Sequence, residues 1–154
     1  MLLARRIWNW CRRFRYRCGY GVHSPSDFFL ITSVIYEGLP YYAYDRLKAS
    51  SGLKSLPHYR EKVNRLLFRL VNYFRPVSLI EVGEGNGDSF RYMREARLSM
   101  KAVSLKGEDQ AETLRQLKVE LEKVEKLDFL HIAYTTYDKD IFEMAYPYLH
   151  AQSC

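Results

Sequence analysis

One stretch, residues 78–88, constrains the fold of this chain more than any other. It contains Ser-Leu-Ile-Glu-Val-Gly-Glu-Gly-Asn-Gly-Asp, so an apolar run passes directly into three glycines at alternate positions. Such a run predicts a buried strand that ends in a tight turn and leads into a helix. Because glycine lacks a Cβ, it adopts positive φ angles and lets a ligand lie directly against the backbone. The stretch therefore predicts a strand–turn–helix unit with a ligand-binding turn.

The spacing of the glycines distinguishes this turn from a dinucleotide-binding loop. The dinucleotide pattern is G-x-G-x-x-G, and the residue three positions after Gly87 is Phe90. The diagnostic residue here is Glu81, a carboxylate two positions before the first glycine, Gly83. For a cationic ligand, a carboxylate at the end of a strand is a more suitable partner than a loop built to bind phosphate. Glycine-rich turns of this kind also occur where no ligand binds, so a purely structural role stays open.

The positive charge of the chain is confined to its N-terminal end. The chain has 154 residues and a formal net charge of +6, with 47% hydrophobic and 27% charged residues. This composition is typical of a single globular domain. The basic residues that precede the first acidic residue, Asp27, are Arg5, Arg6, Arg12, Arg13, Arg15 and Arg17. The rest of the chain has equal numbers of basic and acidic residues, so its body is neutral and its N-terminal arm is basic.

Cysteine content and hydropathy indicate the compartment. The chain has three cysteines and no C-x-x-C pair, which argues against a disulfide framework and against a zinc site. The apolar segment 1–4 is too short for the core of a signal peptide, and no apolar run approaches the length of a membrane span. We therefore expect a cytoplasmic protein without a bound metal.

The first 18 residues predict a basic amphipathic helix. One side carries Leu3, Ile7, Trp10, Cys11, Phe14 and Cys18, and most of the arginines lie on the other sides. Such a helix can lie on an anionic membrane surface, contact nucleic acid through its phosphates, or pack its apolar side on the body of the same protein. We favour packing on the body, because amphipathic helices usually dock on their own domain.

The rest of the chain predicts helices followed by a regular alternation of strands and helices. Ser24, Pro25 and Asp27 form a capping box that starts a helix. The apolar periodicity predicts further helices over 41–51 and 57–74, strands near 78–82, 101–105 and 128–134, and helices near 90–96, 114–124 and 138–149. Strands that alternate with helices indicate an α/β domain with a parallel sheet and right-handed crossovers.

Three segments in succession carry a resemblance to a known family. They are residues 20–25 (Tyr-Gly-Val-His-Ser-Pro), the helix at 66–76, and Ile80-Glu81-Val82-Gly83 with the glycines that follow. In this order they resemble bacterial class I S-adenosylmethionine-dependent methyltransferase-like proteins that carry a helical N-terminal cap. The resemblance covers about residues 15 to 150. It implies a three-layer Rossmann-like fold, with residues 1–76 as the cap and its basic arm, and 77–154 as a partial α/β core of one compact domain.

The resemblance also implies a ligand and a set of binding residues. The ligand is S-adenosylmethionine, and the activity would be methyl transfer to an acceptor that the sequence does not identify. The residues that match the cofactor-binding positions, or lie close enough to them to act in their place, are Glu81, Gly83, Gly85, Asn86, Gly87 and Glu108. No residue matches a catalytic position, and His131 is interpreted as a wall residue within a strand rather than as a general base.

The chain departs from the family pattern at several positions. Lys106 stands where the family usually has an acid that binds the ribose hydroxyls, and Ala133 and Thr136 stand where it has an acid and a histidine. Residues 106–128 leave room for one helix and no strand, so the predicted sheet is shortened to three strands. Two alternatives follow: an inactive relative or fragment that serves as an interaction module, or a nucleic-acid binder that uses the basic arm. The open edge of a short sheet also predicts either a homodimer that covers this edge or a marginally stable monomer.

Overall fold

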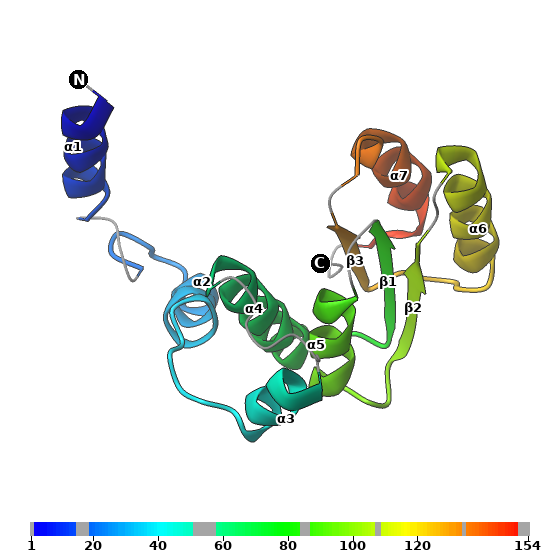
Figure 1. Cartoon of the computed structure of the whole chain (residues 1–154), viewed down its shortest axis with the longest axis horizontal. Coiled ribbons are helices and arrows are strands. Elements are labelled where there is room, and N and C mark those ends of the chain that lie inside the picture. The colour runs from blue at the N-terminus through cyan, green and yellow to red at the C-terminus, as the bar shows by residue number, and fades with distance from the viewer. Residues whose placement is uncertain are drawn as a thin grey trace. The chain divides into compact units, whose positions relative to one another are not determined.

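The predicted alternation of helices and strands is present in the computed structural model, which describes residues 2–14, 19–50, 58–83, 87–106, 109–133 and 135–150. The chain divides into two compact units, residues 1–40 and residues 41–154 (Figure 1). Within the described ranges, no helix combines the length and the apolar content needed to span a bilayer.

The described residues of the first unit form three helical segments. These are α1 (Leu2–Phe14), α2 (Pro25–Leu30) and a five-residue π-helix, η1 (Ile31–Ile35). The predicted cap is confirmed, because the Ser24 hydroxyl accepts a hydrogen bond from the backbone N–H of Asp27 at 3.4 Å. Thr32 donates its hydroxyl hydrogen to the carbonyl oxygen of Phe28 at 2.8 Å, at the point where α2 passes into the π-helix. The expected helix is therefore present, but its second half is wound as a π-helix.

The second unit contains the α/β core. Its elements are α3 (Tyr42–Ser50), α4 (His58–Phe74), β1 (Ser78–Gly83), α5 (Asp88–Ala96), β2 (Lys101–Leu105), α6 (Gln110–Glu122), β3 (Phe129–Ala133), α7 (Asp138–Ala145) and a final 3₁₀ turn, η2 (Tyr146–Tyr148). The order and type of these elements agree with the sequence prediction. The last predicted helix, 138–149, is shorter than expected, since Pro147 lies where its chain tightens into the 3₁₀ turn.

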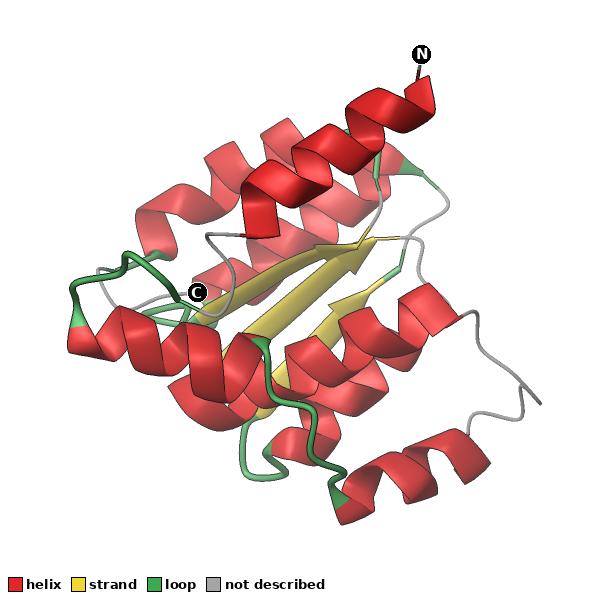
Figure 2. Cartoon of the chain, turned by 90° about the vertical axis from the view of Figure 1, so that its left-hand side faces the viewer, coloured by secondary structure: helices red, strands yellow, loops and turns green. Residues whose placement is uncertain are grey.

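The three strands form a parallel sheet with the order β2–β1–β3, and all three arrows point the same way in Figure 2. The first crossover, through α5, places β2 on one side of β1, and the second, through α6, places β3 on the other side. Every residue of β1 is buried, as expected for the central strand of a parallel sheet. This arrangement is compatible with a Rossmann-like fold, in which strand order reverses beside the first strand.

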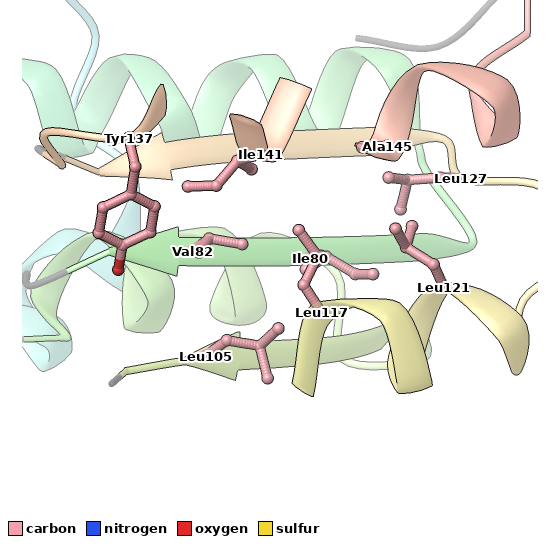
Figure 3. Packing of buried hydrophobic residues seen from close by; sticks show 9 residues of the cluster. All are labelled: Ile80, Val82, Leu105, Leu117, Leu121, Leu127, Tyr137, Ile141 and Ala145. Atoms are coloured by element: carbon pink, nitrogen blue, oxygen red, sulfur yellow. The ribbon is translucent and has the colours of Figure 1, made fainter. Parts of the chain in front are cut away.

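The sheet is covered on both faces, so the core has three layers. On one face, side chains of α4 and α5 pack against the strands, and the buried members are Leu67, Val71, Leu79, Met93, Met100 and Phe129. On the other face, α6 and α7 cover the sheet, and the buried members are Ile80, Val82, Leu105, Leu117, Leu121, Leu127, Tyr137, Ile141 and Ala145 (Figure 3). The alternation of Leu79, Ile80 and Val82 between the faces follows from the two-residue period of a strand.

The N-terminal end of the sheet is held by Asp128, just before β3. Its carboxylate accepts hydrogen bonds from the backbone N–H groups of Val77 at 2.7 Å and Ser78 at 3.0 Å, and lies 2.9 Å from Nε2 of His150. Burial by itself raises the pKa of Asp128, but the hydrogen bonds from His150, Ser78 and Val77 outweigh burial and hold the pKa below its usual range. One carboxylate thus connects the start of β1, the start of β3 and the segment after α7.

The segment after α7 returns to the sheet beside β3. Leu149 forms an isolated parallel bridge with Leu127, and the backbone N–H of Leu127 donates to the carbonyl oxygen of Tyr148 at 2.9 Å. In the described part of the sheet, β3 is an edge strand that pairs with β1 alone. The bridge therefore pairs Leu149 with a residue that precedes β3, and not with β3 itself.

Candidate functional site

The candidate site begins with Glu81, which lies in the central strand as the glycine motif predicts. Its side chain faces the layer of α4 and α5, because it is two residues beyond Leu79, which packs in that layer. Only 2% of Glu81 is exposed to solvent. A buried carboxylate is costly unless hydrogen bonds compensate for its lost hydration.

Three side chains supply that compensation. Ser89, in the first turn of α5, donates its hydroxyl hydrogen to Oε1 of Glu81, and Ser104 of β2 donates to Oε2 at 3.5 Å. Nδ1 of His131, on β3, lies 3.3 Å from Oε1. Ser104 and His131 are the register partners of Glu81 on the two neighbouring strands, so Ser104, Glu81 and His131 form one polar row across the sheet. We call these four residues the Glu81 cluster.

The first glycine of the motif lies at the end of β1, against the backbone of β3. Gly83 ends β1, has a φ of 143° and pairs with Ala133 of β3. A Cβ at this position would lie 1.8 Å from the carbonyl oxygen of Ala133, far inside any allowed contact. Glycine is therefore required at position 83 by the neighbouring strand itself, whether or not a ligand binds.

The last glycine of the motif starts α5. Gly87 is the N-cap residue, with a left-handed φ of 82°, and a Cβ there would lie 2.8 Å from Nζ of Lys106. Lys106 follows β2, and the end of its side chain lies beside Gly87 at the start of α5. Its ammonium group therefore lies beside the helix end where the macrodipole is positive, a position that favours anions over cations.

The structure describes some, but not all, of the site residues that the sequence predicts. Glu81, Gly83 and Gly87 all lie at or near the C-terminal end of β1, with Gly87 at the start of α5. Gly85, Asn86 and Glu108 lie outside the described residues. The three positions that depart from the family pattern are all described: Lys106 follows β2, Ala133 ends β3, and Thr136 is exposed between β3 and α7.

Sequence reasoning does not identify Ser89, Ser104 and His131 as partners of Glu81. A signal is present, since Ser104 and His131 are polar residues inside otherwise apolar strands. The pairing depends on strand register, which the sequence alone does not specify. The predicted position of His131 within the third strand is confirmed, and its side chain is 19% exposed.

The site lies at the topological switch point of the sheet. The chain leaves β1 through α5, on one face of the sheet, whereas it leaves β3 toward α7, on the opposite face, so the connections at the C-terminal ends of these neighbouring strands diverge. Open α/β sheets bind their ligands at such a point. Gly83, Gly87, the Glu81 cluster and Lys106 lie toward this end of the sheet.

A separate hollow of about 440 Å³ lies between β2 and α6. It is lined by Leu105, Glu112, Arg115, Gln116, Val119 and Glu120. Leu105 belongs to the face that α6 and α7 cover, whereas Glu81 faces the opposite layer. The hollow is open, and none of its lining residues belongs to the Glu81 cluster or to the glycine motif, so it is not part of the candidate site.

Comparison with known proteins does not assign the chain to a family, because no family model, no curated protein and no solved structure matches it significantly. Within the described ranges, no group of three or more His, Cys, Asp or Glu side chains is arranged to hold a metal ion. The function must therefore be inferred from the geometry of the site.

Proposed function

We propose that this chain is a class I methyltransferase-like domain that binds S-adenosylmethionine at the C-terminal ends of β1 and β3. The observation that supports the proposal best is that Glu81, Gly83 and Gly87 of the Glu-Val-Gly-x-Gly-x-Gly motif lie at the switch point of a parallel sheet. The motif resembles that of the family, and the switch point is where such folds bind ligands. The two arguments are independent of each other.

The cofactor, when bound, supplies an activated methyl group for transfer to an acceptor. The residues of this chain would supply position and charge. Glu81 supplies a buried carboxylate two residues before Gly83, and its partners Ser89, Ser104 and His131 keep that carboxylate in one orientation. Gly87 allows close approach to the start of α5. We assign no general base, because no described side chain is positioned by a motif for that role.

Lys106 makes the proposed binding weak. An acid at this position would accept hydrogen bonds from ribose hydroxyls, whereas an ammonium group only donates hydrogen bonds. Loss of a charge-assisted hydrogen bond typically costs about 1.5–3 kcal/mol, which corresponds to a roughly 10- to 150-fold loss of affinity. The Lys106→Glu variant should therefore bind S-adenosylhomocysteine more tightly than the unchanged chain, by a factor within this range.

Calorimetric titration with S-adenosylhomocysteine tests the proposal. The matched control is Lys101→Glu, which makes the same charge change at the opposite, N-terminal end of β2 and is exposed. We expect Lys106→Glu to tighten binding and Lys101→Glu to leave it unchanged. Equal effects of both variants would mean that only net charge matters. Absence of heat from both Lys106→Glu and the unchanged chain would refute the cofactor site.

A second candidate is an inactive relative that acts as an interaction module. The observation that favours it is the engagement of Glu81, because both of its carboxylate oxygens already interact with side chains of the protein. In this hypothesis the Glu81 cluster serves stability alone. The unchanged chain and Lys106→Glu would then both fail to bind the cofactor, while Glu81→Gln would lower the melting temperature.

A further inference from the structure

Helix α1 carries a surface that neither the α/β core nor the proposed cofactor site explains. At about 100° per residue, Ile7, Trp10 and Phe14 lie on one side of the helix, and Arg5 and Arg12 lie on the opposite side. The rings of Trp10 and Phe14 are in contact, with their centroids 5.4 Å apart. The three apolar side chains therefore form a continuous ridge along α1.

This ridge is open to solvent within its own unit. Ile7 is 55% exposed, Trp10 58% and Phe14 59%. More than half of each of these residues stays exposed. The first unit therefore does not bury the apolar side of α1, which the sequence predicts to pack on the body of the protein. Trp8, which lies on the polar side of the helix near Arg12, is 67% exposed as well. A monomer rarely exposes several large apolar side chains side by side unless they contact a partner.

The charge of α1 indicates the kind of partner. The helix contains Arg5, Arg6, Arg12 and Arg13 and no acidic residue, and the basic excess of the whole chain lies in residues 1–17. A helix that has tryptophan on its apolar side and several arginines on its polar side has the composition of an interfacial helix. We propose that α1 lies in the surface of an anionic lipid membrane, with its ridge toward the acyl chains.

Other partners account for only part of this surface. Nucleic acid would use the arginines to contact phosphates, but it gives no reason for an apolar ridge on the opposite side. A second copy would cover the ridge, but it would bring two strongly basic helices together, and like charges repel. The remainder of the chain has no excess of acidic residues to match the arginines. An anionic membrane matches both sides of the helix at once.

The chain contains a specific reporter for this proposal, because its two tryptophans, Trp8 and Trp10, are both in α1. Intrinsic tryptophan fluorescence of the full chain therefore reports on this helix alone. The experiment is a titration with phosphatidylcholine vesicles, with and without phosphatidylserine. We expect a blue shift and co-sedimentation only with phosphatidylserine, and both should weaken as salt is added.

Two pairs of variants separate the contributions of the two sides. Ile7→Glu should abolish binding, whereas Leu39→Glu, which changes another exposed apolar residue (68%) of the same unit, should leave it unchanged. Each basic residue near an anionic surface contributes about a fivefold factor. Arg5→Glu with Arg12→Glu should therefore weaken binding at least about 25-fold. The control with the same change in net charge is Lys62→Glu with Lys118→Glu, on exposed positions of the second unit, and it should change binding much less.

Three results would overturn the proposal. Equal binding to neutral and anionic vesicles, or to neither, would exclude an anionic membrane. Binding of DNA or RNA that Ile7→Glu leaves unchanged, without vesicle binding, would assign the arginines to nucleic acid. A blue-shifted spectrum without vesicles that is lost in Ile7→Glu, together with a lower melting temperature or loss of a dimer, would show that protein covers the ridge.

Discussion

The substitution Gly83→Ala tests why the glycine motif begins where it does. A Cβ at this position would lie 1.8 Å from the carbonyl oxygen of Ala133 and 2.6 Å from its carbonyl carbon. Ordinary contact begins at 3.4 Å, so the ends of β1 and β3 would have to separate by about 1.6 Å. The atoms in conflict belong to the backbone of a paired strand, so no side-chain rotation relieves the overlap.

The cost has two parts. A sparsely populated backbone conformation costs about 1–3 kcal/mol when the residue is not glycine, and φ here is 143°. Overpacking in a close-packed region costs typically about 1–3 kcal/mol. We expect Gly83→Ala to lower the free energy of unfolding by about 2–6 kcal/mol, a large part of the roughly 5–15 kcal/mol that keeps a domain folded.

Two matched variants identify the cause. In Gly87→Ala, the Cβ would lie 2.8 Å from Nζ of Lys106, the mobile end of a long side chain, so only the left-handed φ costs about 1–2 kcal/mol. In Gly38→Ala, no atom lies within 4 Å of the added carbon, and the change should stay within about 0.5 kcal/mol. Urea unfolding followed by far-ultraviolet circular dichroism measures all three, and the slope m should be unchanged.

The order of the three effects decides the question. If Gly83→Ala costs no more than Gly87→Ala, the contact with Ala133 is not what requires glycine, and the close approach of β1 and β3 is misjudged. If the predicted order holds, Gly83 is needed for folding even without a cofactor. Binding experiments should then be directed at Lys106 rather than at this glycine.

Two further outcomes follow from the ends and edges of the sheet. Asp128→Asn should lower the unfolding free energy at neutral pH by about 1.5–3 kcal/mol. Because the pKa of Asp128 is depressed in the folded state, this contribution is fully present above the unfolded pKa of about 4 and is lost as pH falls through the folded pKa. The difference in unfolding free energy between the variant and the unchanged chain should therefore shrink in acid. The edge of β3 should support a homodimer, because it pairs with β1 alone in the described sheet. Sedimentation that shows a monomer at every protein concentration would contradict the dimer.

Much of the fold follows from local patterns. Helix α4 has an apolar stripe at helical spacing, β2 has the bounds that its sequence pattern predicts, and the Ser24 cap forms as its capping box predicts. These features depend on residues within one or two turns of each other. Their energetic preferences act before any tertiary contact forms, so they can be recognised in a linear sequence.

The make-up of the candidate site is only partly predictable. The position of Glu81 at the end of a buried strand follows from the apolar run before the glycines. Its hydrogen bonds do not, because Ser104 and His131 are 23 and 50 residues away along the chain. They meet Glu81 only because β2 and β3 pair with β1 in one particular register.

The sequence by itself therefore determined the elements, the glycine turn and the basic helix α1. The tertiary structure alone decided that β3 lies beside β1 rather than beside β2, and with it the switch point, the Glu81 cluster and the contact of Gly83 with Ala133. The physical reason is that strand order and register depend on how two helical layers bury the sheet as a whole. Such non-local packing is not encoded in the periodicity of any single segment.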